Sequence, residues 1–385
     1  MSKLSEMLKE LCPDGVEFVP LWSVTIWDKK FNAVERYKQP VVDSYQYLLA
    51  NDLFLMEVDC GDVFLLSTGE KTGWTTEDVA GEYLKEGEVV SIPWGKSRAV
   101  TDCIKYYKGK FVTADNRIAT SSNTGILSNK YLYYWMMSRG QVIDSFYRGS
   151  GIKHPDMAKV LDMQIPVPPL AIQNETVKLL DNFTELTAEL QLRKKQYSFY
   201  RDSLLNFSRD DAEVEWKTLG EVSSKICSGG TPSSSNSSYY HGNIPWLRTQ
   251  EVDWSDIYDT GGKISEEGLS NSSARWIPAN CVIIAMYGAT AAKAAINRIP
   301  LTTNQACCNL EVNESIALHK YVYHWVYSQY ENLKAKGQGS QSNINKKTIE
   351  GYPIPIPPLE TQAKIVSILD RFDALCHDLT QGLPA

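Results

Sequence analysis

One long internal repeat restricts the folds that this chain can adopt. Residues 166–190 read PVPPLAIQNETVKLLDNFTELTAEL, and residues 355–379 read PIPPLETQAKIVSILDRFDALCHDL. Eleven of the 25 aligned positions are identical, and the two copies lie 189 residues apart. This spacing is far longer than the roughly 20–50 residues of a solenoid repeat. The sequence therefore predicts two copies of one domain.

Matching segments extend the repeat upstream and give each copy the same internal order. KYLYYW at residues 130–135 matches KYVYHW at residues 320–325. Short apolar runs bounded by glycine, proline and polar residues precede these segments and are typical of strands. A length of 385 residues fits two domains of ordinary size. We predict an α+β fold with two β-rich domains in a pseudo-two-fold arrangement, each followed by a short aromatic helix (residues 130–139 and 319–330).

In each copy an extended proline-rich stretch leads into a long helix. The helix can begin only after the last proline, because proline is excluded from a helix interior. The first helix is expected from about residue 171 to 207, and the second after residue 358. Their apolar or long side chains alternate spacings of four and three, as in a coiled coil, so the helices should pack on each other. The predicted seam positions are Leu179, Phe183, Leu186, Leu190, Arg193, Tyr197, Tyr200 and Leu204, and then Ile365, Ile368, Phe372, Leu375 and Leu379.

The N-terminal segment is expected to complete the shorter second copy. The repeat places residues 1–11 opposite residues 199–209, at the end of the first long helix. We therefore predict an N-terminal helix beside the C-terminal one, with adjacent chain ends. The expected segments are an N-terminal helix (1–12), a first β-rich domain (13–165), a central helix (166–210), a second β-rich domain (211–354) and a C-terminal helix (355–385).

Composition narrows the class of protein. No apolar run approaches the roughly 18 residues of a membrane span, and the first residues lack the apolar region of a signal peptide. Eight cysteines without a paired pattern favour free thiols in a reducing, cytoplasmic setting. The net charge of −7 counts against a chain that binds DNA alone, since Lys and Arg contacts to phosphates dominate such binding. It does not count against one subunit of a DNA-binding complex.

No catalytic, metal-binding or cofactor-binding group is predicted. The two Pro-Pro motifs lack the polar and aromatic neighbours of an amino-methyltransferase motif. Residues 94–97 (WGKS) resemble the end of a phosphate-binding loop, but Val90 stands where that loop needs glycine. His154 is expected to face solvent or a phosphate, and His324 to be packed in the core.

Loops that combine glycine with aromatic, basic and amide residues are the candidate binding surface. Such side chains contact base edges and phosphates, and glycine allows close approach of the backbone. Any one of these loops is typical of an ordinary surface turn, but they recur at matching places in both copies. The candidate DNA contacts are Lys71, Thr72, Trp74, Lys96, Ser97, Arg98, Lys153, His154, Thr231, Trp246, Arg248, Thr249, Tyr287, Thr290, Lys293, Ser340 and Asn343.

Taken together, several motifs resemble the DNA-specificity subunit of type I restriction–modification systems. They are CPDGVEF at residues 12–18, the paired Ile-Pro-x-Pro-Pro-Leu stretches with Gln173 and Gln362, Leu-Asp-x-Phe in each helix, GGTPSSS at 229–235 and IPWLRTQEV at 244–252. The resemblance implies that each β-rich copy is a target-recognition domain that reads half of a split site in double-stranded DNA. It also implies an antiparallel helical spacer that docks two methyltransferase subunits and performs no chemistry, and it leaves open whether restriction subunits join.

The two copies differ most over residues 25–88 and 223–276, which favours an asymmetric target. Half-sites about one helical turn apart, roughly 34–36 Å, suit a pseudo-dimer. The alternative function is an adaptor or assembly protein whose paired domains bind another macromolecule, with the helices mediating assembly.

Overall fold

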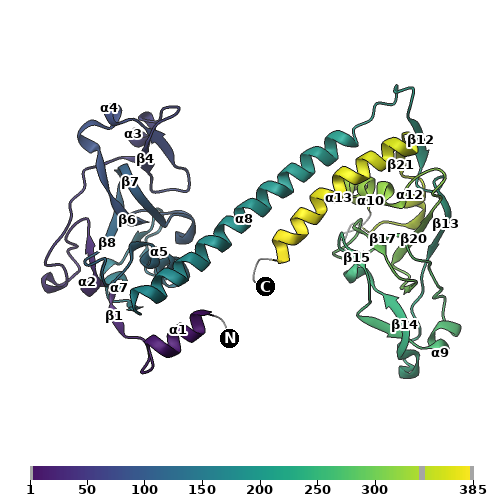
Figure 1. Cartoon of the computed structure of the whole chain (residues 1–385), viewed down its shortest axis with the longest axis horizontal. Helices are drawn as coiled ribbons and strands as arrows, with labels where there is room; N and C mark the ends of the chain where they lie inside the picture. The colour runs from purple at the N-terminus through teal and green to yellow at the C-terminus, as the bar shows by residue number, and fades with distance from the viewer. Residues whose placement is uncertain (1–2, 338–342, 382–385) are drawn as a thin grey trace. The chain divides into compact units, whose positions relative to one another are not determined.

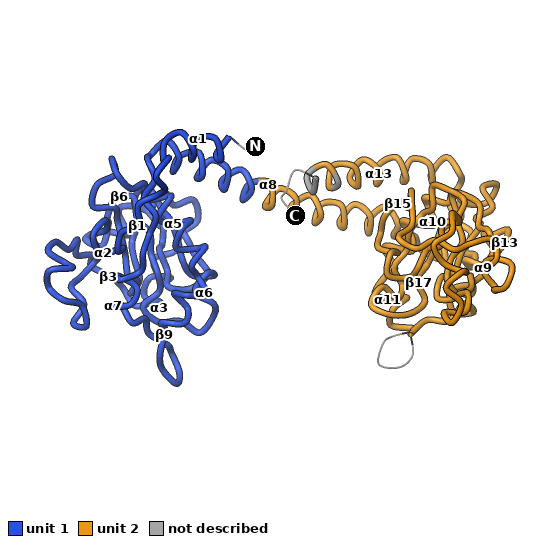
Figure 2. The backbone as a smooth tube through the Cα atoms, turned by 90° about the horizontal axis from the view of Figure 1, so that it is seen from below, with its two compact units in different colours: residues 1–185 blue, residues 186–385 orange. Residues whose placement is uncertain are grey.

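The computed structural model describes residues 3–337 and 343–381, and the chain divides into two compact units, 1–185 and 186–385 (Figure 2). The boundary falls inside the longest helix, α8 (Leu170–Leu204), so each unit contains part of it. The side chains of residues 377 and 379–381 are outside the description.

Unit 1 is built on a seven-stranded mixed sheet in the order β2-β8-β6-β7-β4-β5, with β3 paired to β7 (Figure 1). Its longest strands are β6 (Lys85–Pro93) and β7 (Lys105–Ala114), which pair antiparallel. The second half of β6 is buried on both faces, which explains its continuous apolar run. The other strands are β1 (Phe18–Pro20), β2 (Thr25–Trp27), β3 (Tyr47–Leu48), β4 (Val63–Leu66), β5 (Gly73–Thr75), β8 (Asn116–Ser121), β9 (Tyr147–Arg148), β10 (His154–Pro155) and β11 (Gln164–Pro166).

Short helices cover the sheet of unit 1 and close its core. The predicted aromatic helix is α5 (Asn129–Ser138), which begins where the Ser128 hydroxyl accepts a hydrogen bond from the Tyr131 N–H. It buries Leu132 and Trp135 in the main core. The remaining helices are α1 (Lys3–Leu11), α2 (Leu21–Val24), α3 (Ala50–Leu55), α4 (Glu77–Ala80), α6 (Gly140–Ser145) and α7 (Met157–Leu161), with 3-10 turns at Arg36–Lys38, Gly81–Tyr83 and Val100–Asp102.

Unit 2 contains a five-stranded sheet in the order β13-β20-β17-β18-β15 and a three-stranded sheet in the order β16-β14-β19. Every residue of the central strand β17 (Val282–Ala285) is buried. The other strands are β12 (Glu215–Thr218), β13 (Ser223–Ser228), β14 (Tyr240–Leu247), β15 (Asp256–Ile257), β16 (Gly262–Ile264), β18 (Ala294–Asn297), β19 (Thr302–Thr303), β20 (Cys307–Val312) and β21 (Pro353–Ile356). The helices are α9 (Glu266–Ser270), α10 (His319–Ser328), α11 (Tyr330–Ala335), α12 (Lys346–Glu350) and α13 (Leu359–Gln381), with 3-10 turns at Ser237–Tyr239 and Thr249–Glu251.

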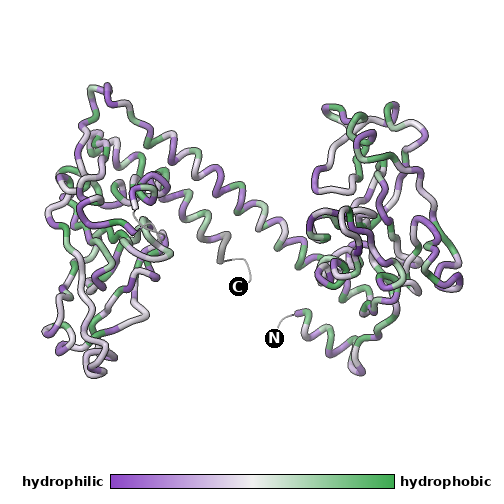
Figure 3. The backbone as a smooth tube through the Cα atoms, turned by 180° about the vertical axis from the view of Figure 1, so that it is seen from behind, coloured by the Kyte–Doolittle hydropathy of each residue, from purple (hydrophilic) through white to green (hydrophobic). Residues whose placement is uncertain are grey.

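The long helices begin where the prolines end, as predicted. The carbonyl oxygens of Pro169 and Pro358 accept hydrogen bonds from the N–H groups of Gln173 and Gln362, at 3.2 and 3.0 Å. Hydrophobic and hydrophilic residues alternate along α8 (Figure 3). Within unit 2, α13 packs on α8, and the Tyr200 and Phe372 rings stack with centroids 5.1 Å apart. The predicted α+β fold and the packing of the two helices are confirmed.

The seam of α13 differs from the predicted one. Ile365, Val366 and Leu369 are buried, whereas Ile368 and Leu375 are 38% and 45% exposed. The reason is that α13 packs against α10, so its buried face is the one turned to the core of unit 2, and Ile368 and Leu375 lie beside that face. On α8, Leu190 and Tyr197 are buried, and Leu179 is exposed. Phe183, Leu186, Arg193 and Leu204 are half-buried, and the side chain of Leu379 is outside the described part of the chain.

Helix α1 lies in unit 1 with no buried residue, and its Lys3 ammonium contacts Glu175 of α8 at 2.9 Å. The expectation that it completes the second copy stays a prediction. Among the described residues, no helix is both long and apolar enough to cross a membrane.

Candidate nucleic-acid interface

Three loops of unit 1 are tied together at one edge of the unit. The loop after β6 pairs with the segment before β10, because Lys96 and Lys153 exchange backbone hydrogen bonds of 3.1 and 3.2 Å. The exposed Arg98 guanidinium contacts Glu70 at 2.6 Å and so links residues 67–72 to the same edge. The structure therefore places Arg98 and Lys153 on two paired segments, with Lys71 in the adjoining loop.

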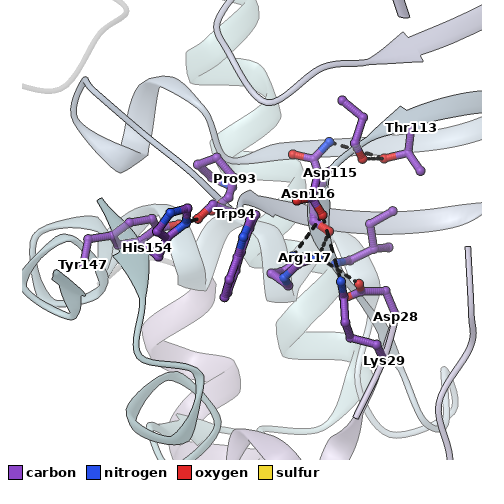
Figure 4. A network of polar contacts seen from close by, with 12 residues as sticks. Asp28, Lys29, Pro93, Trp94, Thr113, Asp115, Asn116, Arg117, Tyr147 and His154 are labelled. Atoms are coloured by element: carbon purple, nitrogen blue, oxygen red, sulfur yellow. Dashed lines mark hydrogen bonds and ion pairs between the residues drawn. The ribbon is translucent and has the colours of Figure 1, made fainter. Parts of the chain in front are cut away.

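Trp94 is the centre of this edge. Its ring lies between the Arg117 guanidinium, 4.2 Å from the ring centroid, and the His154 ring, 4.9 Å from it (Figure 4). His154 Nδ1 is 2.9 Å from the Trp94 carbonyl oxygen. A carbonyl oxygen only accepts hydrogen bonds, so Nδ1 carries the proton in this contact. The His154 side chain is exposed at the surface. This contact gives His154 a fixed orientation.

Arg117, on the other side of the Trp94 ring from His154, is itself held by two carboxylates. It is 2% exposed and contacts the carboxylates of Asp28 at 3.2 Å and Asp115 at 2.9 Å (Figure 4). Burial raises the pKa of the Asp28 carboxyl above its usual range, although Arg117 acts in the opposite direction. Removing one partner of a buried ion pair is strongly destabilising. The two carboxylates therefore hold the Arg117 guanidinium in place against the Trp94 ring.

Lys96 is a structural residue, which corrects its place among the predicted DNA contacts. Its side chain is 5% exposed, bonds the Asp144 carboxylate and lies 4.9 Å from the centroid of the Tyr147 ring. Partial burial acts to raise the pKa of Asp144, but Lys96 and the Val100 N–H lower it below its usual range. The ammonium group is therefore engaged inside unit 1 and has almost no exposed surface.

The other predicted contacts of unit 1 lie at the surface. Lys71 pairs with Glu57 at 2.9 Å, and both side chains are exposed. Trp74 is exposed on β5, with its ring against that of Phe64. Ser97 is exposed and Thr72 is half-buried.

The predicted loops of unit 2 are joined in a similar way. The Gly230 N–H donates to the Thr303 carbonyl at 2.9 Å, and the Ile344 N–H donates to the Met286 carbonyl at 2.8 Å. The Thr290 hydroxyl donates to the Thr249 carbonyl at 2.7 Å. The chain approaches itself so closely here that a Cβ atom at position 229 would lie 1.9 Å from the Thr303 carbonyl oxygen, which explains the glycine.

The exposed side chains of this group are mostly neutral. Thr231 is exposed and donates a hydrogen bond from its hydroxyl to Gln305, while Tyr287 and Asn343 are also exposed. The cations are paired, since Lys293 contacts Asp253 at 2.5 Å and Arg248 lies 3.7 Å from Glu251.

Trp246, a second residue among the predicted DNA contacts, is also buried. It is 7% exposed, and its indole N–H donates to the Gly230 carbonyl at 3.0 Å, so it supports the loop and is not available to a base. Ser340 lies outside the described residues.

Comparisons with known proteins identify the family. The family described as "Type I restriction modification DNA specificity domain" matches residues 35–196 and 212–385. The specificity subunit of the Escherichia coli type I restriction enzymes EcoR124I and EcoR124II is 31% identical, over all of this chain and 93% of that protein. The chain belongs to the family of type I DNA-specificity subunits. It is thus the non-catalytic DNA-specificity member of a restriction–modification complex.

Two further relatives of this specificity subunit agree. A putative type I specificity subunit of Haemophilus influenzae is 29% identical over 80% of each chain. The crystal structure of the M. genitalium type I S subunit matches with a TM-score of 0.62 at 15% identity, over 95% of this chain and 92% of that one. The structural likeness supports the fold, and family membership decides against the general adaptor.

Sequence reasoning missed three residues that shape the interface: Asp28, Arg117 and Gln305. The Asp28–Arg117 pair joins residues 89 positions apart, which no local pattern predicts. One feature of the sequence could have pointed to Gln305 as an interface residue: it ends the polar segment TTNQ, which follows an apolar run.

Proposed function

We propose that each unit of this specificity subunit reads one half of a split, asymmetric DNA target. The observation that carries the proposal is the difference between two similarly built loop groups. Unit 1 exposes the cations Arg98 and Lys153 on the segments next to Trp94, and Lys71 in the loop that the Arg98–Glu70 contact joins to them. Arg and Lys favour guanine edges and phosphates, whereas amides and hydroxyls suit other base edges and make weaker phosphate contacts. Unit 2 exposes Thr231, Tyr287 and Asn343, and its cations Arg248 and Lys293 are only half-exposed beside carboxylates, so the two half-sites should differ.

The contacts proposed in each half are the predicted residues that are exposed or half-buried. In unit 1 they are Lys71, Thr72, Trp74, Ser97, Arg98, Lys153 and His154, and in unit 2 Thr231, Arg248, Thr249, Tyr287, Thr290, Lys293 and Asn343. Paired cations such as Arg98 must exchange a carboxylate partner for DNA, which costs little at an exposed site.

We also propose that two methyltransferase subunits dock on the long helices. Exposed apolar side chains on α8 and α13, among them Leu192, Phe199 and Ile368, offer a surface for such partners. The partners would supply the positive charge that a chain of net charge −7 lacks, and the complex would work in the cytoplasm.

Methylome sequencing with and without this gene, in cells that keep the methyltransferase gene, tests the proposal. Deletion should abolish methylation at one bipartite, non-palindromic motif, and restoring the gene should return it. An unchanged methylome, with the methyltransferase active, would overturn the proposal.

A further inference from the structure

Each unit is attached to a long helix by a buried glutamine. In unit 1, Gln173 in the first turns of α8 has no exposed surface. Its Oε1 accepts a hydrogen bond from the Ser128 N–H at 2.9 Å, and its Nε2 donates to the carbonyls of Ile126 and Pro168, both at 2.7 Å. The amide thus joins the helix to the start of α5.

Unit 2 repeats this arrangement at the matching position. Gln362 of α13 is also fully buried, and its Oε1 accepts from the Leu318 N–H at 2.9 Å. Its Nε2 donates to the carbonyls of Ile316 at 3.1 Å and Pro357 at 2.8 Å. All partner atoms belong to the backbone, so the attachment can persist while the side chains of the recognition domain change.

A second attachment lies eight residues further along each helix. Asp181 of α8 contacts the Lys130 ammonium at 2.7 Å and the Tyr134 hydroxyl at 2.6 Å. Asp370 of α13 contacts Lys320, and lies 3.1 Å from His324 Nε2. Eight residues span about 12 Å along a helix. Two bonds at that separation resist the rocking that a single attachment would allow.

We propose that these glutamine–aspartate pairs are positioning residues that set the spacing selectivity of the subunit. They hold each reading face at a fixed angle to its own helix. One base-pair step rotates the duplex by about 34–36°, so a rigid face accepts one spacing and rejects its neighbours. The inference rests on the proposed split target.

The test measures methylation at sites whose half-sites are one base pair closer together or further apart than in the native motif. In Gln173→Ala and, separately, Asp181→Asn, methylation at these sites relative to native sites should rise at least about tenfold, because the first change removes three hydrogen bonds and the second weakens two. Gln362→Ala should do the same through unit 2. Asp181 is part-exposed, so its variant should fold even if Gln173→Ala does not.

The matched control is Leu53→Ala, a fully buried residue in a separate core of unit 1. It should lower thermal stability and reduce methylation at all sites in proportion, without changing the spacing ratio. The inference is overturned if Gln173→Ala and Asp181→Asn behave as this control does. If the complex with the wild-type subunit methylates no motif of fixed spacing, the proposed function is overturned instead, and the inference with it.

Discussion

Two lysines in one small region show how burial separates structural from binding residues. Lys96 and Lys153 exchange backbone hydrogen bonds, but only the Lys153 side chain is exposed. We predict that Lys153→Ala weakens DNA binding by the assembled complex without changing the melting temperature. The slope of the logarithm of the binding constant against the logarithm of the salt concentration should become smaller by about one. Lys96→Ala should instead lower stability by about 2 kcal/mol, because it removes a charged hydrogen bond. Fluorescence anisotropy at several salt concentrations and thermal melting measure both, and the opposite pattern would contradict the assignment.

Composition and loop position predicted which segments of the interface matter, but not which of their side chains face outwards. Trp246 and Lys96 have residue types common in DNA contacts, and both are buried. Their burial depends on partners distant in sequence, Gly230 for Trp246 and Asp144 for Lys96. The same limitation hid Arg117 and Asp28.

At the scale of elements, α13 has two different faces. Leu369 is fully buried in the core of unit 2, while its neighbour Ile368 is exposed. Leu369→Ala should destabilise the subunit by about 2–5 kcal/mol. Ile368→Ala should change stability by less than about 0.5 kcal/mol but weaken binding of the methyltransferase subunit.

Differential scanning calorimetry and a titration of the methyltransferase subunit separate these effects. The docking proposal fails if Ile368→Ala assembles as tightly as the wild type. It also fails if this variant loses as much stability as Leu369→Ala.

The long helices and the central strands were predicted from the sequence because their signals are local. Prolines mark the start of α8 and α13, and continuous apolar runs mark β6 and β17. The seam of α13 was not predicted correctly because α10 packs against it, and that contact is non-local.

At the scale of the whole molecule, the repeat predicts a circular order of segments. Joining residue 385 to residue 1 with a short flexible linker, and reopening the chain between Asp210 and Asp211, should preserve folding and the methylated motif. Residues 209–213 are exposed, so the new ends should be tolerated. Size-exclusion chromatography and methylome sequencing check this. A permutant that only aggregates would contradict the prediction that the N-terminal helix completes the second copy.

We propose that the two units of this chain read the two halves of one target independently. Exchanging residues 13–165 for the corresponding domain of a relative with a different target, followed by methylome sequencing, tests it most directly. If the units read independently, one half of the methylated motif changes to that of the relative, while the other half and the spacing stay the same. A chimera of native stability in which both halves change, or neither does, would contradict it.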